Sequence, residues 1–373
     1  MRVLFIAPLP PPVTGHSLAT KIFLEELSKF HQVEVVNLSK ESFVQGVDSF
    51  KRIIQVVILL KEVWRKRKSA DIIYLTISES FAGNIKDLFI YLMCAQCLSN
   101  MYIHLHGGSL KRLLFDKHKV LFCINRWFMK KLAGVIITGR AHISIFEGII
   151  QQKQIHVVPN FAQDYLFSSE QEIVAKFSSL CPMRILYIGG LIPEKGFNEL
   201  ADAYLILDSE LKKIVRIDFA GMFEAEPQKV KFLRKIAGVD HLRYHGIVDG
   251  AEKKNLFSQA HVFCLPTSLL EGQPVSILEA YASGCVVLTT GQRGISDIFA
   301  AGVNGFEIQA RSAASIKSVL EAIVGKPENL LKIAVANRKT ASEKYRTSAY
   351  CSSLRAIIET RPPGVSQVTE GVS

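Results

Sequence analysis

The sequence predicts an α/β protein in which two doubly wound, Rossmann-like domains face each other across a cleft. Short apolar runs alternate with stretches of helical periodicity along nearly the whole chain, a pattern typical of parallel sheets with crossover helices. The chain has 373 residues, which is more than one hydrophobic core usually organises. The alternation is lost at residues 161–182 and then begins again. We therefore expect an N-terminal domain at residues 1–165 and a C-terminal domain at residues 166–345.

The first domain is expected to contain six strands separated by five helices, because each apolar run is followed by a turn or by helical periodicity. Strands are predicted at residues 3–7, 33–38, 72–77, 102–106, 134–138 and 156–159. A stiff, proline-rich loop at residues 8–15 follows the first strand. Helices are predicted at residues 17–30, 49–68, 84–98, 118–132 and 141–150.

The second domain repeats the alternation. Strands are predicted at residues 183–189, 215–220, 242–245, 262–265, 286–289 and 305–308. Helices are predicted at residues 198–209, 227–237 and 251–258, from Pro274 onward, at 313–324 and at 327–359. The C-terminal helical residues 346–360 are expected to pack back toward the first domain, and residues 361–373 to be disordered. In such sheets ligands bind outside the carboxyl ends of the strands, so the site is expected in the cleft.

Charge and composition limit the classes of function. The formal net charge of +11 is concentrated in residues 1–165, which carry 21 basic and 12 acidic residues against 24 and 22 in the remainder. A basic first half indicates an anionic partner, such as membrane lipid, nucleic acid or a phosphorylated substrate. No apolar run reaches the ~18 residues needed to span a bilayer, and the apolar start is too short for a signal peptide. We expect a cytoplasmic protein that is at most peripherally attached to a membrane.

The seven cysteines are odd in number and most lie in apolar surroundings, which indicates reduced, buried thiols. Cys94 and Cys97 have the spacing of a redox motif. They lie within an apolar run, however, so core packing is the favoured interpretation.

The stretch from Glu271 to Gly284 carries the strongest functional signal. Its two carboxylates, Glu271 and Glu279, lie eight positions apart and flank a predicted helix start. Pro274 suits the first helical position, and Gly284 is a natural left-handed helix end. Unpaired amides at this helix start would form a seat for phosphate or another anion. Two carboxylates beside such a seat suggest a polyhydroxylated ligand that carries a diphosphate. The seat would involve Gly272, Gln273, Pro274 and Val275.

Loops after two strands of the first domain supply further candidates. Gly15 follows the first strand at a helix start, where it either lets the backbone approach a phosphate or simply makes the turn. His106 ends a predicted strand and is interpreted as a hydrogen-bond donor to a ligand. A metal site shared with His104 is not expected, because no carboxylate or cysteine partner lies close by.

The loop after the first strand of the second domain combines glycines with a cation. Gly189 and Gly190 permit close backbone approach to a ligand, and Lys195 supplies a positive charge beside the proposed diphosphate. Arg293, which follows a later strand, is a weaker candidate. A dinucleotide-binding site is not expected, since no G-x-G-x-x-G opens the first strand–helix unit, and no Walker A lysine loop is present.

These motifs together resemble a known family. The sequence is similar to the retaining glycosyltransferases of family 4, also called group 1 glycosyl transferases, which have the GT-B fold. The resemblance implies transfer of a sugar from a nucleotide diphosphate donor to an acceptor, with retained anomeric configuration, no metal and no further cofactor. It covers about residues 1–350. The motifs that carry it are, in order, Gly15, His106-Gly107, Pro159-Asn160, Lys195-Gly196 and Glu271-x7-Glu279.

The resemblance also implies roles for individual residues. Glu279 would bind the ribose hydroxyls of the donor, and Glu271 the donor sugar, with the backbone that follows it at the diphosphate. Lys195 would neutralise the leaving diphosphate, which is the dominant chemical need in such a transfer. His106 would contact the donor sugar, and the Gly15 loop would lie between phosphate and acceptor.

One departure from the family concerns the phosphate contacts. Members usually have an arginine directly after the glycine of the first strand of the second domain, and this chain has Gly190 there. The diphosphate would then depend on Lys195 and the helix start, or on Arg293 reaching in.

Two basic, apolar segments of the first domain are candidates for binding anionic lipid. The alternative is that their apolar faces pack into the core and the cations only favour the helix dipole. Nucleic-acid binding is not expected, because exposed aromatics do not interleave regularly with the basic residues. The first segment comprises Ile53, Val56, Val57, Leu60 and Trp64 followed by residues 65–68, and the second Lys111, Arg112 and residues 117–131, with Trp127, Phe128 and Met129.

The sequence thus predicts a retaining glycosyltransferase that extends a lipid-linked surface polysaccharide, such as an O-antigen, capsule or exopolysaccharide. Two alternatives remain open at this point. One is a sugar-nucleotide epimerase of the same fold, which would act on a single substrate. The other is a degenerate, non-catalytic sugar-binding subunit, for which Gly190 is the supporting feature.

Overall fold

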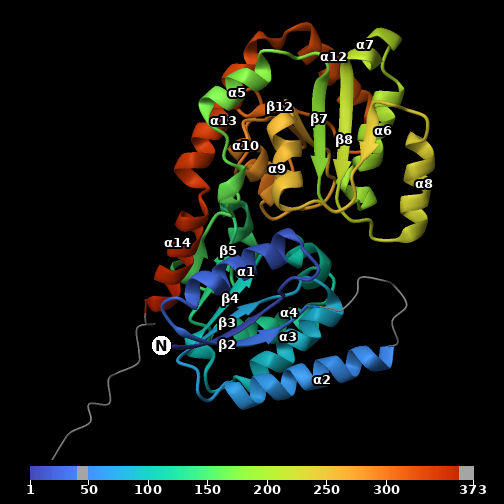
Figure 1. The fold of residues 1–373 in the computed structure, drawn as a ribbon. Coiled ribbons are helices and arrows are strands. Elements are labelled where there is room, and N and C mark those ends of the chain that lie inside the picture. Colours follow the sequence, from blue (N-terminus) through green and yellow to red (C-terminus); the bar gives the residue numbers. More distant parts are fainter. Residues whose placement is uncertain (40–48, 361–373) are drawn as a thin grey trace, which may run out of the picture.

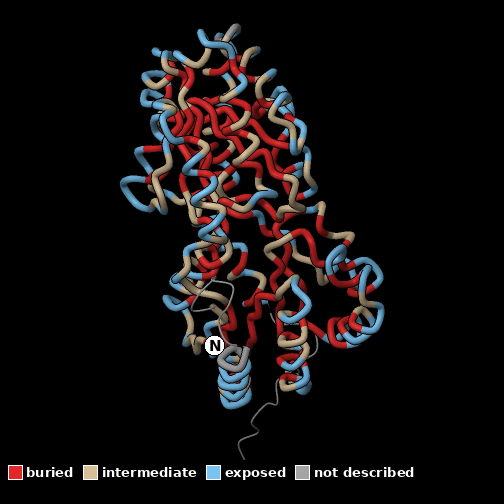
Figure 2. The backbone as a smooth tube through the Cα atoms, turned by 90° about the vertical axis from the view of Figure 1, so that its right-hand side faces the viewer, coloured by how far each residue is buried: buried red, intermediate tan, exposed pale blue. Residues whose placement is uncertain are grey.

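The computed structural model describes residues 1–39 and 49–360, which form two α/β halves, each built on a six-stranded parallel sheet (Figure 1). The predicted fold class is therefore confirmed. Buried backbone is concentrated in the interior of each half, where the strands lie (Figure 2). The tail that was predicted to be disordered, residues 361–373, lies outside the described residues.

The first sheet has the strand order β2-β1-β3-β4-β5-β6. Its apolar runs form central strands because nearly every side chain of β1, β3, β4 and β5 is buried on one face or the other. The carboxyl ends of these parallel strands share one edge, which brings together the loops that follow β1, β3 and β4. The strands are β1 (Arg2–Ala7), β2 (Gln32–Asn37), β3 (Ile72–Thr76), β4 (Met101–Leu105), β5 (Gly134–Ile137) and β6 (Ile155–Val157).

Helices cover both faces of the first sheet. One face packs against α2, α3 and α4, and the other against α1 together with α14 from the far end of the chain (Figure 1). The α14 side chains Tyr350, Leu354 and Ile358 are buried in the same cluster as Phe5 and Phe23. The helices are α1 (Gly15–Leu27), α2 (Ser49–Lys66), α3 (Phe81–Met93) and α4 (Lys119–Met129), with short 3-10 turns at Leu98–Asn100, Arg140–Ile145, Gln152–Gln154 and Asp164–Leu166 and a π-helical turn at Lys111–Phe115.

The second sheet has the strand order β12-β11-β10-β7-β8-β9, and its core includes the apolar face of α10. Its strands are β7 (Met183–Ile188), β8 (Val215–Ala220), β9 (Leu242–Tyr244), β10 (Val262–Leu265), β11 (Val286–Thr289) and β12 (Gly305–Glu307). Its helices are α5 (Glu170–Phe177), α6 (Phe197–Leu205), α7 (Ser209–Ile214), α8 (Glu226–Ile236), α9 (Gly250–Gln259), α10 (Val275–Ala282), α11 (Arg293–Ser296), α12 (Ala313–Gly325) and α13 (Leu330–Lys344), with 3-10 turns at Pro193–Lys195 and Pro327–Asn329; α14 (Thr347–Glu359) ends the described chain.

Two predicted helices are wrong in extent. The helix expected at residues 141–150 is only a 3-10 turn, because the side chain of Asp297 binds the amide of Ala141 and Gly148 has a φ of +70°. The helix expected at residues 327–359 breaks at Tyr345–Arg346. Here the carbonyl of Tyr345 accepts a hydrogen bond from the amide of Ala162 at 2.8 Å, and Arg346 is extended. The segment that joins β6 to α5, which is the linker between the two sheets, thus occupies the position of the next helical turn.

A helix was also missed in the segment predicted to be irregular, residues 161–182. Helix α5 begins there because Ser169 and Glu172 form a reciprocal capping box. Pro274 is the N-cap of α10 rather than its first helical residue, while Gly284 has the expected left-handed φ of +62°.

All seven cysteines are free, and Cys94, Cys264, Cys285 and Cys351 are buried as expected. Burial raises the pKa of the Cys94 thiol to about 12, which opposes redox reactivity. The expectation of buried thiols is wrong for Cys123 and Cys181, which are exposed because they lie on an outer helix face and in a loop. Among the described residues, no helix is both long and apolar enough to cross a membrane.

Candidate active site

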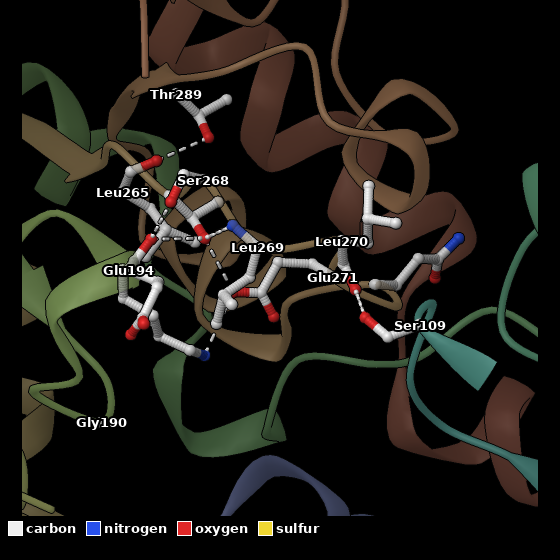
Figure 3. A network of polar contacts seen from close by, with 12 residues as sticks. Ser109, Gly190, Glu194, Leu265, Ser268, Leu269, Leu270, Glu271 and Thr289 are labelled. Atoms are coloured by element: carbon white, nitrogen blue, oxygen red, sulfur yellow. Dashed lines mark hydrogen bonds and ion pairs between the residues drawn. The ribbon is translucent and has the colours of Figure 1, made fainter. Parts of the chain in front are cut away.

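The loop that joins β10 to α10 is held by the first domain at several points. The amide of Asn160 donates to Oε1 of Gln273 at 3.0 Å, and the Asn160 side chain donates to the Gln273 carbonyl at 2.8 Å. On the other side of the loop, the hydroxyl of Ser109 donates to the carbonyl of Leu270 at 3.3 Å (Figure 3). The Nε2 of His142 lies 3.3 Å from the carbonyl oxygen of Glu271. The predicted anion seat therefore lies at the junction of the two halves.

Three loops approach so closely at this junction that only glycine fits. A Cβ at Gly272 would overlap the carbonyl oxygen of His106, and one at Gly294 would overlap the carbonyl of Gly272. Gly15 is close but less constrained, since a Cβ there would lie 3.5 Å from Cγ2 of Val275. The start of α1 therefore faces the start of α10, and the candidate residues Gly15, Gly272 and Val275 are brought together.

Lys195 and Glu271 form an ion pair, with 3.2 Å between Nζ and Oε1. The hydroxyl of Thr267 donates to the same Oε1 at 3.1 Å, which fixes the carboxylate. The Lys195 loop is itself fastened to the Glu271 loop, because the carbonyl of Glu194 accepts from the amide of Ser268 at 2.7 Å (Figure 3). Both side chains keep some exposure, 23% for Lys195 and 14% for Glu271, so a ligand can reach them.

Glu279 is buried inside α10 and is paired with a residue that the sequence analysis did not identify. The Nζ of Lys253 on α9 lies 2.6 Å from Oε1 of Glu279, and the side chains are only 11% and 2% exposed. Burial raises the pKa of Glu279, and Lys253 opposes this shift. A signal was present: Lys253 is three and four positions before Leu256 and Phe257, so it occupies the core-facing side of its helix.

The start of α10 is open to an anion. No side chain caps the helix, whose N-cap is Pro274, so the first amides do not receive a side-chain acceptor. This is the arrangement in which unpaired N–H groups and the positive end of the helix dipole bind phosphate.

A column of three imidazoles lies next to this junction. The rings of His16 and His106 are stacked with centroids 4.2 Å apart, and His106 and His104 are 3.9 Å apart. The hydroxyl of Tyr74 lies 2.6 Å from Nδ1 of His104, while the Nε2 atoms of all three histidines are buried without a partner. Burial lowers the pKa of His16 to about 4 and that of His104 to about 3, and it lowers the pKa of His106 as well. The column is thus neutral at physiological pH and has unused hydrogen-bonding capacity.

The remaining candidates lie at the edges of the site. Gly189 and Gly190 follow β7, and the carbonyl of Gly190 accepts from the hydroxyl of Tyr187 at 2.9 Å. Arg293 is exposed at the start of α11, next to the tightly packed Gly294. No cluster of three or more histidine, cysteine, aspartate or glutamate side chains that could hold a metal ion occurs in residues 1–39 and 49–360.

The same architecture occurs in solved structures, which include a glycosyltransferase. HepE of Anabaena, solved in complex with UDP-glucose, matches with a TM-score of 0.73 and 17% identity over 96% of this chain and 100% of that one. WaaG, a glycosyltransferase involved in lipopolysaccharide biosynthesis, matches with a TM-score of 0.69 and 14% identity over 97% and 100% of the two chains. The two facing domains therefore define the GT-B fold, as the resemblance implied.

A family model matches the second domain. The model of the family "Glycosyl transferases group 1" covers residues 170–340, which is under half of the 373 residues of this chain. A curated relative is EpsD of Bacillus subtilis (strain 168), which its own name assigns to the glycosyltransferases only provisionally. It is 27% identical over 157 residues, and the match spans 42% of this chain and 40% of EpsD.

Proposed function

We propose that this protein transfers a sugar from a nucleoside diphosphate sugar to a glycan acceptor, with retention of anomeric configuration and without a metal ion. The observation that carries the proposal is the position of Lys195, which pairs with Glu271 at 3.2 Å at the junction beside the uncapped start of α10. A cation and a helix N-terminus together can stabilise the two negative charges of a leaving diphosphate. The UDP-glucose bound to HepE supports this class of donor.

Each site residue has a role in the proposed reaction. The diphosphate lies on Lys195 and the first amides of α10, the donor sugar lies against Glu271, and the ribose hydroxyls bind Glu279. The unpartnered Nε2 of His106 donates to or accepts from a hydroxyl of the donor sugar. As the bond between the anomeric carbon and the diphosphate oxygen breaks, Lys195 exchanges part of its interaction with Glu271 for one with the departing oxygen. The acceptor hydroxyl attacks from the leaving-group side and gives its proton to that oxygen, which retains the configuration.

The acceptor is proposed to be a lipid-linked glycan used in surface polysaccharide synthesis. The neighbour WaaG, which acts in lipopolysaccharide biosynthesis, supports this class of pathway. A lipid-linked acceptor requires the protein to work at a membrane surface, on the cytoplasmic side where nucleotide sugars are made.

A face of the first domain suits such a surface. Helices α2, α3 and α4 cover the same side of the sheet and each exposes large apolar side chains, which lie among exposed cations on α2 and α4. Phe128 and Met129 do not contribute, because they are buried in the core. Lys131 and Arg67 lie over the rings of Trp127 and Trp64, which keeps positive charge beside the aromatic groups. The exposed apolar residues are Ile53, Val57, Trp64, Phe89, Leu92, Val120, Ile124 and Trp127, and the exposed cations include Lys61, Arg65, Lys68, Lys117, Lys119, Arg126 and Lys130.

The reaction is tested by incubating the purified protein with UDP-, GDP- and ADP-sugars, with and without lipid-diphosphate-linked sugar acceptors. Release of nucleoside diphosphate that depends on the acceptor, with a product of the donor's anomeric configuration by NMR, is the expected result. Conversion of one donor sugar into another without an acceptor would instead identify an epimerase. Donor binding without turnover for any acceptor would identify a sugar-binding subunit.

The membrane surface is tested by sedimentation with vesicles of phosphatidylglycerol or phosphatidylcholine at low and high salt. Binding is expected only to the anionic vesicles, and replacing Val57 and Val120 by serine should weaken it. The matched control replaces Ile247 and Val303, two equally exposed apolar residues of the second domain, by serine. Equal loss in both variants, or no binding by the unaltered protein at low salt, would contradict the membrane role.

A further inference from the structure

The buried cation next to Glu279 is not required by the fold of α9. Lys253 lies on the face of the helix that also buries Leu256 and Phe257, a face that is otherwise apolar. Burying a lysine there costs free energy unless it is fully paired. It has two partners: Oε1 of Glu279 at 2.6 Å and Oε1 of Gln163 at 3.1 Å.

The second partner belongs to the linker between the domains. The hydroxyl of Tyr165 lies 3.3 Å from Oε1 of Gln163 and 3.4 Å from Oδ1 of Asp249, so the linker, α9 and α10 converge on the ammonium group of Lys253. This arrangement uses Oε1 of Glu279 and leaves Oε2 without a hydrogen bond to any described residue. One carboxylate oxygen is therefore anchored, and the other keeps its capacity to accept a hydrogen bond.

We propose that Lys253 is a positioning residue that holds Glu279 ionised, with Oε2 aimed at a hydroxyl of the donor ribose, and thereby makes the site selective for ribonucleoside diphosphates. This inference rests on the proposed function, because it assumes that Glu279 contacts the nucleotide. An ionised acceptor binds a hydroxyl about twice as strongly as a neutral one. Without Lys253, Glu279 would be a buried carboxyl near Asp249 with nothing to favour its charge or fix its rotamer.

The test measures selectivity rather than activity. The dissociation constants of UDP, 2′-deoxy-UDP and 3′-deoxy-UDP are measured by calorimetry for the unaltered protein, Lys253→Met and Lys253→Arg. The unaltered protein should bind UDP about 10- to 100-fold more tightly than the analogue that lacks the contacted hydroxyl, which is the effect of one hydrogen bond to a charged group. Lys253→Met should reduce this ratio at least about fivefold, and Lys253→Arg should preserve most of it.

A matched control separates this role from a loss of stability. Lys176 is another poorly exposed lysine of the same half, and its Nζ donates to the carbonyl of Ser283 at 2.7 Å. Lys176→Met and Lys253→Met should both destabilise the protein to chemical denaturation, but Lys176→Met should leave the ratio between UDP and its deoxy analogues unchanged. An unchanged ratio in Lys253→Met, or an equal fall in Lys176→Met, would overturn the inference while leaving the proposed function in place. If the unaltered protein binds none of UDP, ADP, GDP and dTDP, the proposed function fails and this inference fails with it.

Discussion

Replacing Gly190 by arginine should strengthen donor binding, because it would add the cation that family members usually have at this position. The structure allows the change. Gly190 does not have a positive φ, and a Cβ there would meet only the end of the Ile192 side chain, at 3.4 and 3.5 Å. The new guanidinium would start from the same loop as Lys195, the ligand of the proposed diphosphate.

The size of the gain follows from the chemistry of the contact. A hydrogen bond to a charged group contributes about 1.5–3 kcal/mol, and arginine can form two to one phosphate. Gly190 is only half-buried, so the lower end of this range applies and the expected gain is about tenfold in the dissociation constant of UDP. The protein should not lose stability, since replacing a glycine whose backbone suits other residues restricts the unfolded chain and adds about 0.4–1 kcal/mol.

The assay compares the unaltered protein, Gly190→Ala and Gly190→Arg. Calorimetry gives the dissociation constant of UDP at low and high ionic strength, and initial rates give the KM of the donor. Gly190→Ala removes the glycine without adding charge, so it should bind UDP like the unaltered protein. The advantage of Gly190→Arg should shrink as salt screens the added charge.

The reasoning is refuted if Gly190→Arg is folded, with a midpoint of denaturation no lower than that of the unaltered protein, but binds UDP no more tightly than Gly190→Ala. The diphosphate would then lie away from the loop after β7. In that case the role assigned to Lys195 would also be wrong, because both residues are in that loop.

Two further predictions follow from the site. Lys195→Met should lower kcat by about 10²- to 10³-fold, the usual effect of removing one group that stabilises developing charge. The control variant Lys229→Met, which removes an exposed pair with Glu226 at 3.2 Å, should leave kcat unchanged. Unaltered rates for Lys195→Met would exclude the leaving-group role. The stability of the protein should fall as the pH is lowered from about 6.5 toward 4, because the pKa values of His16, about 4, and His104, about 3, are depressed in the folded state and only the unfolded state takes up protons in this window. Each histidine changes the free energy of unfolding by at most about 1.4 kcal/mol per pH unit. Urea titrations should therefore show a shallower pH dependence of this free energy for His16→Gln. An identical slope would mean that the pKa of His16 is not depressed in the folded state.

Features set by local sequence were predictable, and features set by contacts between distant segments were not. The alternation of apolar runs and helices was sufficient to predict two parallel sheets, since β1, β3 and β7 are apolar on both faces. Glu271, Lys195 and Gly284 were identified from their places at strand ends and at a helix terminus. Their contacts could not be derived in this way: the pairing of Lys195 with Glu271 depends on the bond between Glu194 and Ser268, which lie 74 residues apart.

The errors have the same origin. Nothing local ends a helix at Tyr345, whose break depends on Ala162. At residues 141–150 only Gly148 is a local signal, and the contact of Asp297 with the amide of Ala141 comes from a distant segment. Lys253 was overlooked because a lysine in a short amphipathic helix usually faces water. Its spacing from Leu256 and Phe257 in the sequence gave only its side of the helix, and the carboxylate that explains its burial lies 26 residues later.

The contacts of the linker place the donor site and the connection between the domains in one network. Asn160 binds Gln273 on the phosphate side of α10, and Gln163 binds Lys253 on the Glu279 side. These two linker residues are three positions apart. Asn160 contacts the start of the segment that is proposed to hold the nucleotide, and Gln163 is connected to Glu279 of that segment through Lys253. A rotation of one domain against the other must therefore either break these bonds or move α9 and the start of α10 with the linker. For this reason we expect the affinity for the proposed nucleotide donor and the angle between the domains to be coupled, whichever acceptor the first domain binds.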